Sequence, residues 1–125
     1  MPSSELDEFA ALLIEHVRDA AIRSCDRRLR PDANSVIARR WREVGATGGG
    51  GADVLIADCV DDTIFHLLRS IDEGLLPLKF VSKSGRVVDL VEEGSSELAG
   101  EYMGGGVWRE AHSKERIGDY FSDDS

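Results

Sequence analysis

Two long amphipathic segments constrain the fold of this chain more than any other feature of its sequence. In the first, apolar side chains recur every third or fourth residue, which is the spacing of one helix face. That stripe consists of Leu6, Phe9, Ala10, Leu13, Val17, Ala20 and Ala21. The pattern predicts a helix from about Glu5 to Leu29, because Pro31 disfavours helix in the residue before it. Arg18 and Asp19 are expected on the opposite, solvent side.

The second amphipathic segment predicts a helix from Ala52 to Glu73. Its core face consists of Ile56, Val60, Ile64, Leu67, Leu68 and Ile71. Gly74 stands where a left-handed residue ends many helices. Two helices with such apolar stripes are expected to bury them against each other.

The segment between the two long helices predicts a loop, a short helix and a flexible linker. Asp32, Asn34 or Ser35 is expected to cap the short helix, which ends near Val44 and buries Ile37 and Trp41. Residues 45–51 are rich in glycine and are expected to form a flexible loop. A phosphate-binding loop needs a preceding strand and a following Lys, Ser or Thr in register, and neither is present.

The region after Gly74 predicts a β-hairpin followed by short helices. Leu78 and Phe80 alternate with polar residues, Ser84-Gly85 marks a turn, and the strand returns through "RVVDL". A short helix capped by Ser95 or Ser96 is expected next, and Trp108 is expected to anchor its segment to the core.

Together these elements predict one mostly helical α+β domain over residues 1–125. Two long packed helices carry a β-hairpin and short C-terminal helices, and residues 1–4 and 120–125 are expected to fray.

The distribution of charge narrows the class of partner. The net charge is −9, and it arises entirely after residue 50, where seven basic side chains face sixteen acidic ones. Nucleic acids and anionic membranes bind clustered positive charge, so both are disfavoured as partners. A negative surface would instead attract a basic protein partner.

The compartment follows from the cysteines and from hydropathy. Cys25 and Cys59 belong to no CxxC pair, and we expect both to be reduced. The first residues lack the pattern of a secretion signal, and no apolar run approaches the length of a membrane span. We therefore expect a soluble cytoplasmic protein.

One helix face carries residues that suit a divalent metal. Asp58, Asp62 and His66 are four residues apart and project from one side of the predicted helix, and His16 and His112 are candidate ligands from other segments. The same spacing is typical of a solvated helix face. Metal sites in helical bundles usually carry Glu-x-x-His motifs, and this chain has none. We favour the solvated face and keep a metal-binding protein or metal-dependent enzyme as the alternative.

A group of arginines raises the hypothesis of an anion site. Arg23, Arg27 and Arg30 share one side of the first predicted helix, and guanidinium groups suit phosphate. The overall acidity argues against this site. Pairing of these arginines with Asp58, Asp61 or Asp62 within the chain is the favoured interpretation.

The remaining surface predicts protein recognition. Phe65 falls outside the core face of its helix, beside acidic residues that include Asp61, and exposed apolar strips of this kind often form interfaces. The predicted interaction residues are Asp61, Phe65, Glu97 and Trp108. There is no G-x-S-x-G motif and no cysteine with a base nearby in sequence, so no catalytic residue is assigned. We expect a non-enzymatic, acidic interaction module that needs no cofactor and binds a protein partner or forms a homo-oligomer. An inhibitor or immunity-type role is one concrete version of this expectation.

Three segments carry a resemblance. "DDTIFHLLRSIDEG", "ELAGEYM" and "WREAHSKER" resemble segments of small bacterial proteins with no assigned activity. The resemblance implies a bacterial cytoplasmic origin and assigns a role to no residue.

Overall fold

A computed structural model of the chain describes residues 4–45, 51–104 and 107–116. It confirms a mostly helical α+β domain in which two long helical segments pack together and carry a two-stranded hairpin and short C-terminal helices. Most of the glycine-rich loop predicted at 45–51 and the fraying predicted at 120–125 lie outside the described residues. Of the N-terminal residues expected to fray, Ser4 is described and is helical.

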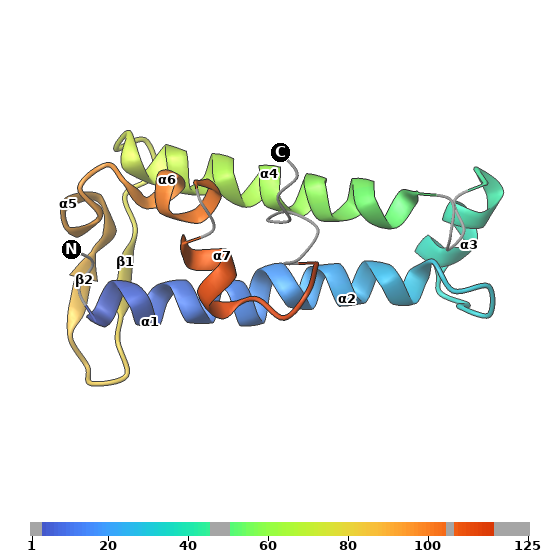
Figure 1. Cartoon of the computed structure of the whole chain (residues 1–125), viewed down its shortest axis with the longest axis horizontal. Helices are drawn as coiled ribbons and strands as arrows, with labels where there is room; N and C mark the ends of the chain where they lie inside the picture. Colours follow the sequence, from blue (N-terminus) through green and yellow to red (C-terminus); the bar gives the residue numbers. More distant parts are fainter. Residues whose placement is uncertain (1–3, 46–50, 105–106, 117–125) are drawn as a thin grey trace.

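The first long segment is one helical rod with three parts, α1 (Ser4–Leu13), the π-helix η1 (Ile14–Arg18) and α2 (Asp19–Arg28). It lies antiparallel to α4 (Ala52–Asp72), as Figure 1 shows. On α4, Ile64, Leu68 and Ile71 of the predicted core face are buried, and Gly74 adopts the expected left-handed conformation, with φ of 76°.

The π-helix η1 overturns part of the predicted helix face. A π-helical turn takes an extra residue, so the residues after it are rotated by about one position, or about 100°, relative to a regular helix. Val17, predicted for the core, is 47% exposed, whereas Arg18 and Asp19, predicted for solvent, are 0% and 1% exposed. The interior of the second half of the rod is therefore partly ionic.

The helix α3 (Val36–Glu43) connects the two long segments at one end of the molecule (Figure 1). Of its three candidate caps, Ser35 is the one used, and its hydroxyl accepts a hydrogen bond from the Ala38 backbone N–H at 3.0 Å. Ile37 and Trp41, predicted to be buried, are half-buried, and Ala38 is the fully buried residue.

The hairpin is confirmed, with β1 (Lys79–Val81) antiparallel to β2 (Val87–Asp89) and Phe80 opposite Val88. A short helix that the sequence analysis did not predict, α5 (Leu90–Gly94), follows directly. The Asp89 carboxylate caps α5 by accepting hydrogen bonds from the backbone N–H groups of Val91 and Glu92. Because this cap begins a helix at Leu90, β2 ends at Asp89, although the alternation of apolar and polar residues alone would extend the strand.

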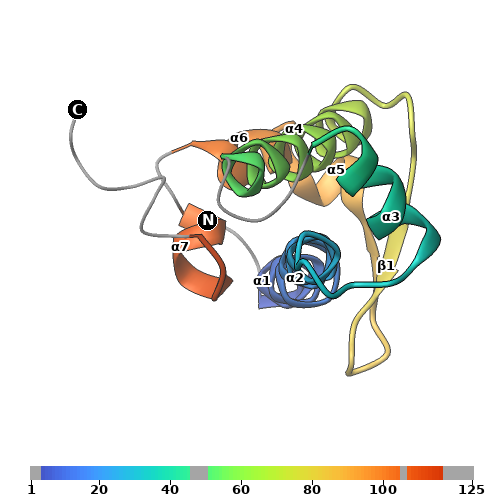
Figure 2. The ribbon, with the colours of Figure 1, turned by 90° about the vertical axis from the view of Figure 1, so that its right-hand side faces the viewer.

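The helices α6 (Leu98–Met103) and α7 (Val107–His112) complete the fold. Seen along the long axis, α7 lies on one side of the helical pair and β1 on the other (Figure 2). The predicted cap of α6 by Ser95 or Ser96 is wrong. Instead, the carboxylate of Asp72 on α4 accepts hydrogen bonds from the backbone N–H groups of Leu98 and Ala99, at 3.0 and 2.9 Å.

The hydrophobic core lies at the end of the molecule that α5, α6, α7 and the hairpin cover. Trp108 is 3% exposed, which confirms its predicted anchoring role. Phe9 packs edge-on against both Phe80 and Trp108, with ring centroids 5.5 and 6.2 Å away. This aromatic group joins α1, the hairpin and α7.

Cys25 and Cys59 are free thiols; Cys25 is half-buried and Cys59 is exposed. Within the described ranges, no helix combines the length and the apolar character that crossing a membrane requires.

Gly94 and Gly100 give a matched prediction about packing. A Cβ atom at Gly94 would lie 2.7 Å from Cγ of the buried Leu98, whereas one at Gly100 would meet no atom within 4 Å. We expect Gly94→Ala to lower the free energy of unfolding by about 1–3 kcal/mol. The control, Gly100→Ala, is expected to raise it by about 0.5–1 kcal/mol, because alanine is the better helix former. Urea unfolding measures both, and equal effects would contradict the packing of Leu98 on Gly94.

Candidate functional site

A buried group of charged side chains lies between η1, α4, α6 and α7, and we call Arg18, Asp61, Tyr102 and Arg109 the Asp61 cluster. The Asp61 carboxylate accepts hydrogen bonds from Arg18 Nε at 2.8 Å and from Arg109 at 2.7 Å. The Tyr102 hydroxyl donates to the same carboxylate at 2.6 Å. One carboxylate from α4 therefore binds a side chain from each of the other three helices.

A second carboxylate extends this network toward the C-terminal side. Asp19, which the π-helix turns inward, accepts hydrogen bonds from Arg18 at 2.8 Å, from the Ser113 hydroxyl at 3.0 Å and from the Lys114 backbone N–H at 2.7 Å. Arg18 also donates to Ser113 Oγ and to the backbone carbonyl of Glu115. These bonds hold the segment after α7 against the first helical rod.

The charge states of the cluster follow from its contacts. Burial alone would raise the pKa of Asp61, but hydrogen bonds from Arg18 and Tyr102 and the charges of both arginines outweigh burial and lower it. Burial and the hydrogen bond to Asp61 raise the pKa of Tyr102. Burial would lower the pKa of Arg18, but Asp61 outweighs it and raises the value. The stable state is one carboxylate, two guanidinium ions and a neutral phenol.

This arrangement suits structure better than catalysis. Among the described residues, every buried side-chain nitrogen or oxygen atom has a hydrogen-bond partner. A general base or nucleophile needs a lone pair directed at substrate and a pKa near the working pH. Asp61 has neither, because its oxygens accept from three side chains and its pKa is lowered.

The shifted groups predict how stability depends on pH. The unfolded pKa of an aspartate is about 3.9, and that of Asp61 is lower in the fold, so its contribution is present above pH 3.9 and is lost as pH falls through the folded value. Tyr102 has a raised folded pKa, so its contribution is present below about pH 10 and declines above it, as the unfolded phenol ionises. Urea unfolding between pH 2 and 11 measures both declines. We expect Tyr102→Phe to lack the decline that Tyr102 causes above pH 10, and an unchanged alkaline profile would contradict the assignment.

The described residues do not assemble the metal site that was kept as the alternative. Asp62 and His66 lie 3.6 Å apart on the exposed side of α4, whereas His112 pairs with Asp7 of α1 at 3.0 Å. Asp58 and His16 are also exposed. Across residues 4–45, 51–104 and 107–116, no three His, Cys, Asp or Glu side chains are placed to share a metal ion. The Asp62 face has the geometry of a solvated helix face.

The arginines proposed for an anion site are spread along the end of the first helical rod and the loop after it. Arg23 pairs with Glu115 at 3.2 Å, and Arg27 and Arg30 are exposed on the first helical rod and the loop after it. Pairing within the chain was predicted, but with Asp58, Asp61 or Asp62. Asp61 instead pairs with Arg18 and Arg109, because the π-helix and α7 bring those two side chains inside.

Of the four predicted interaction residues, two are not on the surface. Asp61 is 2% exposed and Trp108 is 3% exposed, because one belongs to the ionic cluster and the other to the aromatic core. Phe65 is half-buried and packs edge-on against His66, with ring centroids 5.2 Å apart. Glu97 is exposed.

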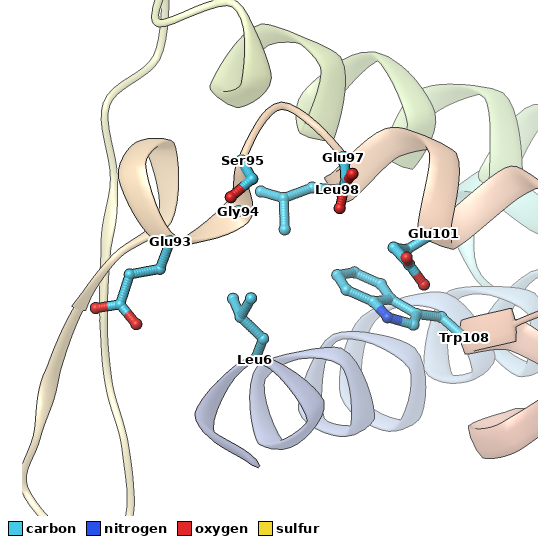
Figure 3. A pocket seen from close by; sticks show the side chains of 8 residues that line it. All are labelled: Leu6, Glu93, Gly94, Ser95, Glu97, Leu98, Glu101 and Trp108. Atoms are coloured by element: carbon cyan, nitrogen blue, oxygen red, sulfur yellow. The ribbon is translucent and has the colours of Figure 1, made fainter. Parts of the chain in front are cut away.

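Glu97 and Trp108 nevertheless line one cavity of about 90 Å³, which we call the glutamate pocket. Its lining residues are Leu6, Glu93, Gly94, Ser95, Glu97, Leu98, Glu101 and Trp108 (Figure 3). Glu93 pairs with Arg86 at 3.0 Å. Glu97 and Glu101 form no ion pair with any described residue, so two carboxylates beside the leucines and the indole of this pocket are left for a ligand.

The sequence analysis did not identify Arg18, Asp19, Tyr102 or Arg109 as members of a site. Each lies in a helical pattern where a polar residue reads as solvent-facing, and a π-helical turn has no marker in this sequence. The spacing of Glu97 and Glu101 was available as a signal, because residues four apart at the start of a helix lie on one face.

Comparison with known proteins adds no family: no family model, no curated protein and no solved structure matches the chain.

Proposed function

We propose that this protein is a non-enzymatic, acidic interaction module that binds a basic protein partner through Glu97, the residue before α6, and Glu101 of α6. The observation that carries the proposal is the glutamate pocket, where Glu97 and Glu101 form no ion pair with any described residue and lie beside apolar side chains. Unpaired carboxylates at an interface attract a partner of opposite charge and fix its orientation.

The distribution of charge supports a basic partner. The excess of acidic side chains lies after residue 50, and the buried arginines Arg18 and Arg109 are already neutralised by Asp61 and Asp19. The outer surface therefore keeps the negative excess. An inhibitor or immunity-type protein of the cytoplasm, which neutralises a basic enzyme, is the concrete form of this proposal.

Charge reversal on the pocket rim tests the proposal. We expect tagged protein to retain basic partners from a native lysate. The Glu97→Lys/Glu101→Lys variant is expected to recover about tenfold less of each partner at the same salt concentration, because each reversal turns attraction into repulsion. The control is Glu15→Lys/Glu43→Lys, which makes the same change of net charge at two exposed glutamates on other helices. Quantitative mass spectrometry of the bound fractions measures recovery. Equal losses in the two variants would show dependence on net charge alone and would contradict the assigned surface.

A second copy of the chain is the alternative partner. An apolar surface near α3 favours it, because Val44, Val54 and Leu55 are 77%, 56% and 65% exposed. Sedimentation of the wild type and of Leu55→Glu over a range of concentrations separates the two partners. A dimer that Leu55→Glu dissociates would establish self-association.

A further inference from the structure

We infer that the glutamate pocket receives the end of a lysine side chain from the partner, with the ammonium between Glu97 and Glu101 and the stem against Trp108. The inference rests on the proposed function and gives it a specific contact. Without such a contact, the acidic surface would attract any basic protein equally.

The shape of the pocket suits a narrow apolar stem. Leu6, Leu98 and Trp108 reach toward one another from α1, α6 and α7 and form its apolar lining (Figure 3). A volume of about 90 Å³ accommodates about three groups the size of water, at ~30 Å³ each. Two methylene groups and an ammonium have about that size.

The charges of the pocket suit a cation. The carboxylates of Glu97 and Glu101 lie at the edge of the cavity, and the indole of Trp108 faces it (Figure 3). Glu93 turns away from the cavity toward Arg86, with which it pairs at 3.0 Å. An ammonium would therefore meet two carboxylates, and the face of an aromatic ring attracts a cation within about 6 Å of its centroid.

Other ligands fit the pocket less well. An anion would be repelled by two carboxylates that no described cation neutralises. A divalent metal needs oxygen ligands at roughly 2.0–2.6 Å from one ion, and no such grouping occurs in the described part of the chain. An uncharged apolar side chain would fill the floor but leave Glu97 and Glu101 desolvated without a partner.

The fluorescence of Trp108 provides a direct test. The chain has two tryptophans, so Trp41→Phe leaves Trp108 as the single reporter. The probe is Nα-acetyl-lysine amide, and the matched control is Nα-acetyl-norleucine amide, which keeps the stem and lacks the charge. We expect saturable, salt-sensitive quenching of Trp108 by the lysine probe in the millimolar range, and none by the norleucine probe. Equal responses to both probes, or no response to either, would overturn the inference.

Neutral substitutions identify the carboxylates. In the Trp41→Phe background, Glu97→Gln and Glu101→Gln are each expected to lower the affinity for the lysine probe by about tenfold, because each removes a charged hydrogen-bond acceptor. Glu92→Gln, an exposed glutamate of α5 outside the pocket, is the control and should change nothing. Equal affinity in all three variants would overturn the assignment of the pocket.

Failure of this inference is distinct from failure of the proposed function. If the lysine probe does not bind but Glu97→Lys/Glu101→Lys still abolishes partner capture, the acidic surface acts without a lysine in its pocket. If capture is also unaffected by charge reversal, the proposed function fails as well.

Discussion

Replacing Asp61 with asparagine is expected to lower the free energy of unfolding by about 3–5 kcal/mol. Asp61 is the carboxylate to which Arg18, Arg109 and Tyr102 all donate, at 2.6–2.8 Å. Asparagine has nearly the same shape but no charge, so two buried guanidinium ions would lose their shared counterion. The loss of one partner from a buried charge group costs far more than the loss of an exposed ion pair.

The neighbouring aspartate gives a matched control. The side chain of Asp62 is 71% exposed and lies 3.6 Å from His66, so Asp62→Asn is expected to change stability by less than about 0.5 kcal/mol. Both variants change the net charge equally and stand one residue apart on α4. Urea unfolding monitored by circular dichroism at pH 7 measures the difference. Similar midpoints for the two variants would contradict a stabilising role for the Asp61 cluster.

Deletion of Val17 is expected to be tolerated, which is unusual for a residue inside a helix. The π-helix η1 holds one residue more than a regular turn, and Val17 is exposed there. Removing it would let the rod continue as a regular helix, with Ile14 before the deletion and Arg18 after it still facing inward. We expect the change in unfolding free energy to stay within about 1.5 kcal/mol.

Deletion of Thr63 is the control, and it is expected to unfold the protein. Thr63 is also exposed, but it lies in the middle of the regular helix α4, which has no extra residue to give up. Its removal would turn Ile64, Leu68 and Ile71 by about 100° relative to the first half of α4 and take them out of the core. The expected loss exceeds about 4 kcal/mol, since several core contacts fail together. Circular dichroism and thermal melting of the two deletions measure the contrast, and equal destabilisation would contradict the π-helical register.

Much of the fold was predictable because hydrophobic periodicity is a local property. The long helix ending at Gly74, the short helix capped by Ser35 and the hairpin turning at Gly85 all follow from spacing and turn residues. The helix α5 and the cap of α6 were not predictable in this way. The cap of α6 depends on Asp72, 26 residues before the Leu98 N–H that it accepts from, and no local pattern indicates that contact.

The candidate sites also divide into features that local sequence patterns indicate and features that depend on contacts between distant segments. Polar residues on a helix are assigned to solvent by default, and the π-helical turn reverses that assignment for Arg18 and Asp19. Asp61 was assigned to the surface by the same default rule. Its burial depends on Arg18 and Arg109, which come from distant segments of the chain. Glu97 and Trp108 were predicted as interaction residues, and the fold brings both to one pocket, although Trp108 forms its lining rather than its rim.

The Asp61 cluster also has a consequence for the order of folding. The hydrogen bonds to the Asp61 carboxylate join residues 41 to 48 positions apart in sequence, and those from Arg18 to the segment after α7 span 95 or more. Contacts of such long range form late, because the entropy of closing the chain must be overcome first. On the ribosome, Arg18 and Asp61 must therefore stay hydrated until the C-terminal helices have emerged. A nascent chain would then keep its two long helices loosely associated, and the burial of these charges would be the step that commits it to the native state.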